Sequence, residues 1–156
     1  MSAATDNFEN KLIDFLLRGQ ALGLNGASAA AGTGPTNAWV SLKLAADSDS
    51  AQGAEVSGGG YARVQVASSL ANWAGTQGAG TTTASSGTSG TTSNNNAITF
   101  PTPTGAWGQV VGFGIHDAAT GGTELFYAAL GQPKTINNGD PAPSFPAGAL
   151  TVQIDN

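Results

Sequence analysis

The 156-residue chain has no cysteine, one histidine and few charged residues, and each scarcity excludes a class of protein. Without cysteine there is no disulfide framework and no thiolate metal site, and one histidine leaves little for a histidine-based site. Charged residues make up 10% of the chain, with 5 Lys+Arg against 10 Asp+Glu, so no basic patch favours nucleic acid. We therefore predict no cofactor, no metal and no nucleic-acid partner.

Long apolar segments are also missing. No run approaches the roughly 18 apolar residues that a membrane helix needs, and the N-terminus lacks the basic and apolar regions of a secretion signal. What the chain has instead is 23 glycines, with abundant Ala, Ser, Thr and Asn. Its length fits one domain, or one small domain with an arm.

One amphipathic helix is predicted, over residues 6–18. Asp6 is the expected N-cap with Glu9 three residues later, and Gly19 is the expected stop. A three-turn helix is not stable alone in water, so it must pack on the body or on a neighbouring subunit. The predicted anchoring interface is its apolar face, with helical spacing: Phe8, Leu12, Phe15 and Leu16.

Residues 19–37 have no charge and no periodicity, and Gly and Pro interrupt them. Two interpretations stay open: a flexible spacer of an anchoring arm, or a surface loop with the helix docked on its own domain. We predict an N-terminal helix and linker arm over residues 1–37, followed by a body over residues 38–156.

The body is predicted to be mainly β. Apolar residues alternate with polar ones in six or seven short segments, as in Val40, Leu42 and Leu44, and turn residues separate them. The expected fold is an antiparallel β-sandwich or jelly-roll-like body of about 6–8 strands. On the strand of Val111, Phe113 and Ile115, Gly112 and Gly114 leave one face thin, so we expect a close approach there.

Residues 68–96 are predicted to form a Gly/Ser/Thr-rich loop. After Trp73 the segment has neither charge nor a large side chain, so alone it cannot bury enough apolar surface to offset its ordering cost. We expect it to be ordered only if something packs on it, and copies in a symmetric assembly are one source of such packing.

No catalytic residue is predicted. His116 and Asp117 form the single His/acid pair, but neighbouring side chains of a strand point to opposite faces, so Asp117 cannot orient His116. No nucleophile-elbow pattern accompanies the many serines. We expect His116 to be a strand-end or interface residue.

Two further motifs resemble ligand-binding loops, but one lacks the residues and the other the following helix that such loops require. The segment from Asp47 to Ser50 begins like a calcium loop, but Gln52 and Gly58 occupy positions that require Gly and Glu. A solvated turn is favoured there. The segment 57–60, Ser-Gly-Gly-Gly, precedes a strand rather than a helix, so it is expected to be a turn or bulge and not a phosphate loop.

Four aromatic residues are candidates for exposed contacts with a sugar: Trp39, Tyr61, Trp73 and Trp107. Aromatic residues at strand ends are more often core or interface anchors, and that alternative is the favoured one.

Several stretches resemble a family of small tailed-bacteriophage virion proteins, variously labelled tail fibre, head decoration or structural protein. They are EVSGGGYARV (55–64) and, in order, NNNAITFPTPTGAWGQVVGFGIHDAATGGTELFYAAL (94–130), PKTINNGD (133–140) and SFPAGALT (144–151), together with the helix segment NKLIDFLLRG. The linker before Ala38 and the Gly/Thr/Ser segment after Trp73 depart from the family's pattern. No catalytic residue comes with the resemblance.

The resemblance implies a non-enzymatic structural component on the outer surface of a phage particle, made in the host cytoplasm. The first expectation is a capsid-decorating, cement or head-fibre protein that binds and stabilises the head shell in many copies. Its partners would be the major capsid protein or other virion proteins, and copies of itself in a dimer or trimer. The alternative is a tail-fibre or tail-tip module that contacts host-surface glycan.

Overall fold

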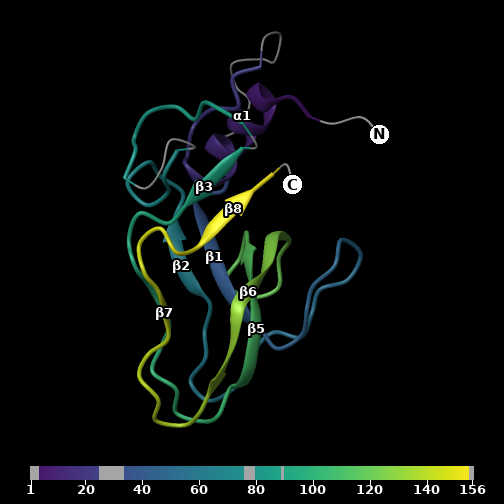
Figure 1. Cartoon of the computed structure of the whole chain (residues 1–156), viewed down its shortest axis with the longest axis vertical. Helices are drawn as coiled ribbons and strands as arrows, with labels where there is room; N and C mark the ends of the chain where they lie inside the picture. Colours follow the sequence, from purple (N-terminus) through teal and green to yellow (C-terminus); the bar gives the residue numbers. More distant parts are fainter. Residues whose placement is uncertain (1–3, 25–33, 76–79, 89, 155–156) are drawn as a thin grey trace. The chain divides into compact units, whose positions relative to one another are not determined.

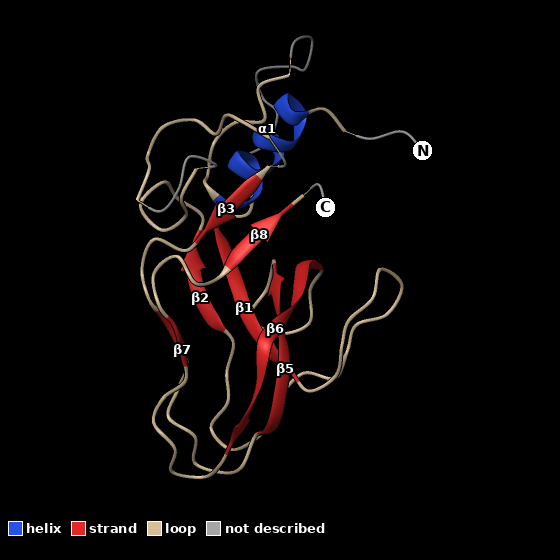
Figure 2. Ribbon diagram, in the orientation of Figure 1, coloured by secondary structure: helices blue, strands red, loops and turns tan. Residues whose placement is uncertain are grey.

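The computed structural model describes residues 4–24, 34–75, 80–88 and 90–154, and it is mainly β with one helix near the N-terminus (Figures 1 and 2). The predicted fold class is confirmed at this level: antiparallel sheets, eight strands and one helix. The elements in chain order are α1 (Asp6–Leu17), β1 (Asn37–Lys43), β2 (Val64–Ala67), β3 (Thr91–Ser93), β4 (Ile98–Thr99), β5 (Gly108–His116), β6 (Glu124–Ile136), β7 (Ser144–Phe145) and β8 (Thr151–Gln153).

The chain divides into two compact units that alternate along the sequence. Unit 1 comprises residues 1–37, 67–97 and 145–156, and unit 2 comprises residues 38–66 and 98–144. Unit 1 therefore contains the helix together with the whole Gly/Ser/Thr-rich segment and the C-terminal strand. Residues 25–33 of the predicted linker lie outside the described residues.

The predicted helix is confirmed over Asp6–Leu17, but its cap differs from the expectation. Thr5, not Asp6, is the N-cap, because its hydroxyl accepts a hydrogen bond from the Phe8 N–H and its own backbone is extended. Asp6 and Glu9 instead lie in the first turn, near the positive end of the helix dipole. Gly19 follows with a φ of 67°, the left-handed conformation that ends helices.

The helix packs within unit 1 on an unusual face. Its buried residues include Ile13 and Leu17, but also the polar residues Glu9, Asn10 and Asp14. Asn10 donates to the Gly87 carbonyl, and an added Cβ at Gly90 would lie 2.8 Å from the Cβ of Glu9. These contacts dock the helix within unit 1.

The four-stranded sheet of unit 2 has the order β2-β1-β5-β6 (Figure 1). Strands β1 and β5 are antiparallel, with Trp39 opposite His116 and Lys43 opposite Gly112. Strands β5 and β6 are also antiparallel, and they form one long ribbon with irregularities near Val110 and His116. The sheet therefore places both glycines of the thin face, Gly112 and Gly114, in a central strand between β1 and β6.

The sequence predicts two strands, over 125–130 and near Ile136, where the structure has the single strand β6. Pro133 lies within β6, beside the register shift between Val110 and Gly112. A proline lacks the N–H for a sheet ladder, and it is tolerated here because β6 is an edge strand with a bulge. The break in the apolar pattern therefore marks this bulge and not a strand end.

Residues 91–93, inside the predicted loop 68–96, form strand β3, so the prediction of an entirely irregular loop is wrong there. Strand β3 pairs antiparallel with β8, with Thr92 opposite Val152. Its polar residues gave no strand signal, because hydrogen bonds replace apolar packing: Thr92 is buried and its hydroxyl donates to the Ala74 carbonyl. Residues 76–79 and 89 of the segment lie outside the described residues.

Candidate functional site

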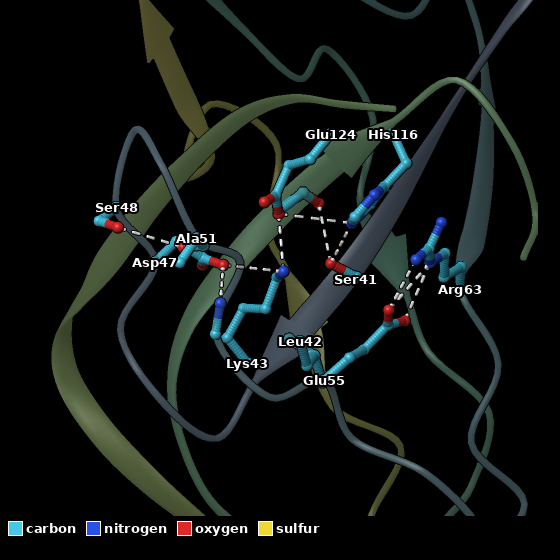
Figure 3. Close-up of polar contacts among 12 residues, drawn as sticks. Ser41, Leu42, Lys43, Asp47, Ser48, Ala51, Glu55, Arg63, His116 and Glu124 are labelled. Atoms are coloured by element: carbon cyan, nitrogen blue, oxygen red, sulfur yellow. Dashed lines mark hydrogen bonds and ion pairs between the residues drawn. The ribbon is translucent and has the colours of Figure 1, made fainter. Parts of the chain in front are cut away.

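A buried ionic cluster occupies one face of the unit 2 sheet (Figure 3). The Lys43 ammonium lies 2.7 Å from the Glu124 carboxylate and 2.9 Å from the Asp47 carboxylate, and all three side chains are nearly inaccessible. Burial lowers the pKa of Lys43, but the hydrogen bonds and charges of Glu124 and Asp47 outweigh it and raise that pKa above its usual value. Lys43 is therefore a buried cation held by two carboxylates.

Gly114 makes room for this cluster. A Cβ at this position would lie 2.1 Å from the Glu124 carboxylate, 2.8 Å from the Ser41 hydroxyl and 2.9 Å from the Lys43 side chain. Side chains from β1 and β6 therefore meet across the bare backbone of β5. This confirms the expected close approach at the thin glycine face.

His116 lies at the end of β5 beside the cluster. Its Nε2 is 2.9 Å from the Ser41 hydroxyl and 3.5 Å from the Glu124 carboxylate. Burial, together with the nearby charges of Arg63 and Lys43, lowers the pKa of His116 to about 4, so the ring is neutral at pH 7. Asp117 does not orient His116, as expected, since its carboxylate accepts from the Thr123 N–H across the β5–β6 turn.

This arrangement does not have the geometry of a catalytic triad. In a triad the serine and the carboxylate contact opposite nitrogens of the imidazole. Here Ser41 and Glu124 both face Nε2, while Nδ1 is buried without a hydrogen-bond partner in the described part of the chain. Ser41 and His116 are also completely buried.

A second ion pair braces the start of the motif at residues 55–64. The Arg63 guanidinium bonds both oxygens of Glu55, at 2.7 to 3.2 Å, and also donates to the carbonyls of Ala118 and Gly121. Burial raises the pKa of Glu55, but the hydrogen bonds from Arg63 and Tyr61 outweigh it and hold that pKa below its usual value. The pair thus fixes the turn 117–123 to the segment before β2.

The three glycines at 58–60 form the predicted turn. All three have φ between 53° and 76°, a region that other residues rarely adopt. The Gly59 carbonyl accepts hydrogen bonds from the Trp107 indole and from the Thr104 backbone N–H. The stretch 55–64 and residues 98–130 of the stretch 94–130 therefore meet in unit 2, around this turn and around Arg63.

A pocket of about 460 Å³ opens beside these contacts. Trp39 and Tyr61 line it, and most of its lining is apolar. The Tyr61 hydroxyl is committed, since it donates to Glu55 and accepts from the Leu42 N–H, and its ring packs edge-on against Trp107. Further lining residues are Glu55, Ser57, Gly58, Arg63 and Thr120.

The four candidate aromatic residues have different surroundings. Trp73 and Trp107 are 0% and 3% exposed, so they are not exposed contact residues, and the favoured alternative of a core anchor holds for both. Each packs in the core of its own unit, and Trp107 also satisfies its indole N–H inside unit 2. Trp39 and Tyr61 are half-buried and are brought together in the pocket.

A polar clamp lies at the end of the helix in unit 1. The buried Arg18 guanidinium contacts the Asp14 carboxylate and the Ser85 hydroxyl, and it donates to the carbonyls of Thr83 and Trp73 at 2.7 and 3.2 Å. Asp14 also accepts from the Ser85 backbone N–H. The described part of the Gly/Ser/Thr-rich segment is thus held by its own helix.

The predicted anchoring residues lie on the other side of the helix. Phe8 is 38% exposed, and Leu12, Phe15 and Leu16 are half-buried. The structure brings these four residues together as one stripe on α1, here called the outer stripe. Their role as an interface stays a prediction.

Sequence reasoning missed the ionic cluster. Lys43 and Asp47 are four residues apart, and Glu124 begins a distant strand, so only the register of β1, β5 and β6 unites them. The available sequence signal was the pair of glycines Gly112 and Gly114, which lie opposite Lys43 and Ser41 in the sheet. Asp47 does not belong to a metal loop, and the described residues contain no group of His, Cys, Asp or Glu that could hold a metal ion. No helix in the described ranges is long and apolar enough to span a membrane.

The fold and these contacts define a small, mainly β structural domain that is braced by internal ion pairs. Residues 3–153 match the family described as "Podophage GP4 fiber I protein gp80", and the chain belongs to that family. It is therefore a structural protein of a phage fibre family, which confirms the resemblance to small tailed-phage virion proteins. Among curated proteins, none matches the chain.

Proposed function

We propose that the chain is a non-enzymatic fibre subunit on the outside of a tailed-phage particle, attached to other virion proteins through the outer stripe of α1. The observation that carries this proposal is the orientation of the helix. Its polar face is buried inside unit 1, whereas Phe8 and the half-buried Leu12, Phe15 and Leu16 remain partly open to solvent. An apolar stripe left outside a domain marks a contact surface.

The buried face explains why this orientation is fixed. Arg18 and Asp14 form an ion pair whose separation would leave a buried charge unpaired. Ile13 and Leu17 are completely buried on the same side of the helix. The helix therefore cannot rotate to hide its outer stripe without breaking these contacts, which supports an attachment partner as the cover of the exposed part of the stripe.

The test is a phage that carries Phe8→Ser and Leu12→Ser together. We expect particles with reduced copies of the protein, as measured by quantitative mass spectrometry of purified virions, while the purified variant keeps its circular dichroism spectrum. Tyr127→Ser is the matched control, because Tyr127 is 39% exposed on unit 2 and lies outside the stripe. Normal copy numbers in the double variant would disprove attachment through the stripe.

Deleting the whole helix is a poorer test. Such a deletion removes Ile13, Leu17 and Arg18 from the core of unit 1, so loss of attachment would not be separable from unfolding.

The non-enzymatic part of the proposal is supported by the environment of the Ser41–His116 pair. Both residues are inaccessible, and the carboxylate of Glu124 faces the wrong nitrogen for a triad. Each charged group of the cluster is compensated by a neighbour, which fits a role in stability.

For the station on the particle we propose the tail, with unit 2 in contact with the host surface. The family description, a fibre, and the open pocket at Trp39 support this choice. The head shell is the second candidate, favoured by the small size of the chain. Cryo-electron microscopy of virions separates them, since hundreds of copies over the head indicate decoration and a few at the tail indicate a tail fibre.

We also propose that the subunit works as a homo-oligomer, a trimer or a dimer, since fibres and decorating proteins are built around symmetry axes. Sedimentation of the purified chain measures this directly, and a monomer at micromolar concentration would contradict it.

A further inference from the structure

The pocket at Trp39 has the features of a site for an uncharged sugar. We propose that it binds a neutral pyranose ring of a host-surface polysaccharide, with Trp39 as the stacking platform. This inference rests on the proposed host-facing role of unit 2. It assigns that role to a pocket distinct from the buried residues Trp73 and Trp107.

The size and lining of the pocket fit one or two sugar rings. Ligand pockets enclose about 300–1,000 Å³ and combine an apolar lining with a few polar groups. This one has about 460 Å³, an aromatic wall of Trp39 and Tyr61, and hydroxyl groups from Ser57 and Thr120. A pyranose ring likewise combines an apolar C–H face with hydroxyl groups at its edge.

The charged residues of the pocket argue for a neutral ligand. The guanidinium of Arg63 donates to Glu55 (Figure 3) and to two backbone carbonyls, and Glu55 also accepts a hydrogen bond from Tyr61. An acidic sugar that approached Arg63 would have to compete with Glu55, which already pairs with the guanidinium. Because the two charges compensate each other, the pocket offers no free charge of either sign.

Trp39 is the residue free to act. Within residues 4–24, 34–75, 80–88 and 90–154, no hydrogen bond engages its indole N–H, and its side chain is half-buried. Tyr61 is different, since its ring packs between Phe100 and Trp107 and its hydroxyl has two partners. Trp39 therefore lines the pocket with an uncommitted indole, whereas Tyr61 provides a fixed wall.

The backbone around the pocket is rigid before any ligand arrives. Arg63 ties the turn at Ala118 and Gly121 to the segment at Glu55, and the Gly59 carbonyl is bonded by Trp107. A preformed site loses less entropy when it binds, which suits weak contacts repeated over many copies.

The experiment is saturation-transfer NMR of the full-length protein with the methyl glycosides of glucose, galactose, mannose, rhamnose and N-acetylglucosamine, and with host-surface polysaccharide. We expect transfer to the ring C–H protons of at least one neutral glycoside at millimolar concentration. Trp39→Ala should weaken binding about tenfold or more, since it removes a large buried contact. The control Tyr127→Ala removes an aromatic residue of unit 2 outside the pocket and should leave binding unchanged.

A second variant tests the pocket even if Trp39→Ala misfolds. Ala119 is exposed and lines the pocket, so Ala119→Arg fills the opening without removing a core side chain. It should abolish transfer while the unfolding midpoint stays unchanged. Absence of binding to every neutral glycoside and polysaccharide, or equal binding by wild type and both pocket variants, would overturn the inference. Attachment of the protein to virions is measured separately, so failure here leaves the proposed fibre role standing.

Discussion

The two units of this protein are stabilised by different kinds of buried polar contact. Both come from a chain with few charged residues and much glycine, and both bury polar or charged side chains beside their apolar residues. Unit 1 is organised by one arginine and one asparagine that bond backbone groups. Unit 2 uses opposite charges that pair with each other across a sheet. The comparison shows that a few buried charges can hold a glycine-rich chain together when they are paired or bonded to backbone groups.

The difference follows from the local backbone. In unit 1 the Gly/Ser/Thr-rich segment has many carbonyl groups outside any ladder, and Arg18 and Asn94 bond several of them. The Asn94 side chain joins the Asn96 and Pro146 carbonyls to the Leu150 N–H. In unit 2 the backbone N–H and C=O groups are already hydrogen-bonded within the sheet. Lys43 and Arg63 therefore form ion pairs with carboxylates.

The largest effect is expected when the clamp of unit 1 is broken. Arg18→Gln removes the charge that compensates the buried Asp14 and the donors to the loop carbonyls, so the free energy of unfolding should fall by about 3–5 kcal/mol. Denaturant unfolding measures it. Lys11→Gln, on the same helix but half-buried, should change stability by less than about 0.5 kcal/mol. Equal effects of the two variants would contradict the clamp.

The next effect concerns pH and tests unit 2. The pKa of His116, about 4 in the folded protein, lies below the usual 6.5, so between these values the unfolded chain binds more protons. The contribution of His116 is fully present above pH 6.5 and is lost as the pH falls toward 4, by up to about 3 kcal/mol.

His116→Gln removes this titration. Its free energy of unfolding should depend less steeply on pH between 4 and 6.5 than that of the wild type, measured by denaturant unfolding at several pH values. The comparison of slopes holds even if the variant is less stable overall. Parallel curves would show that His116 is protonated equally in both states.

A smaller effect is expected at Gly114, the glycine of β5 that makes room for the buried ionic cluster. Gly114→Ala places a methyl group against the Glu124 carboxylate and the Lys43 side chain, so it should destabilise unit 2 by about 1–3 kcal/mol. Gly131→Ala is the matched control in the neighbouring strand, because nothing lies within 4 Å of its added Cβ. Thermal unfolding distinguishes them, and a neutral Gly114→Ala would mean that the cluster can rearrange.

The smallest effect tests the helix cap of unit 1. Thr5→Ala removes the acceptor for the Phe8 N–H and should cost about 1 kcal/mol. Asp6→Ala removes an acidic residue from the first turn, where its charge favours the helix N-terminus, and should cost about 0.3–1 kcal/mol. A larger loss for Asp6→Ala would restore Asp6 as the cap.

Much of the secondary structure could be predicted from the sequence, because local patterns report it. The helix, its stop at Gly19 and most strands follow from apolar spacing and turn residues. Strand β3 and the continuity of β6 did not follow, since a polar strand and a bulged strand carry no clear alternation. The candidate site was predicted only in part: two of four aromatic residues line the pocket, and the ionic cluster was missed.

The sequence by itself determined that the protein is mainly β, has one amphipathic helix, and resembles a virion family. These properties depend on the order of residue types along short segments and on a distinctive string. Only the tertiary structure decided that Lys43, Glu124 and His116 share one buried cluster and that the helix turns its polar face inward. The physical reason is that strand register and the partners of buried charges join residues far apart in the chain, and no local pattern encodes those pairings.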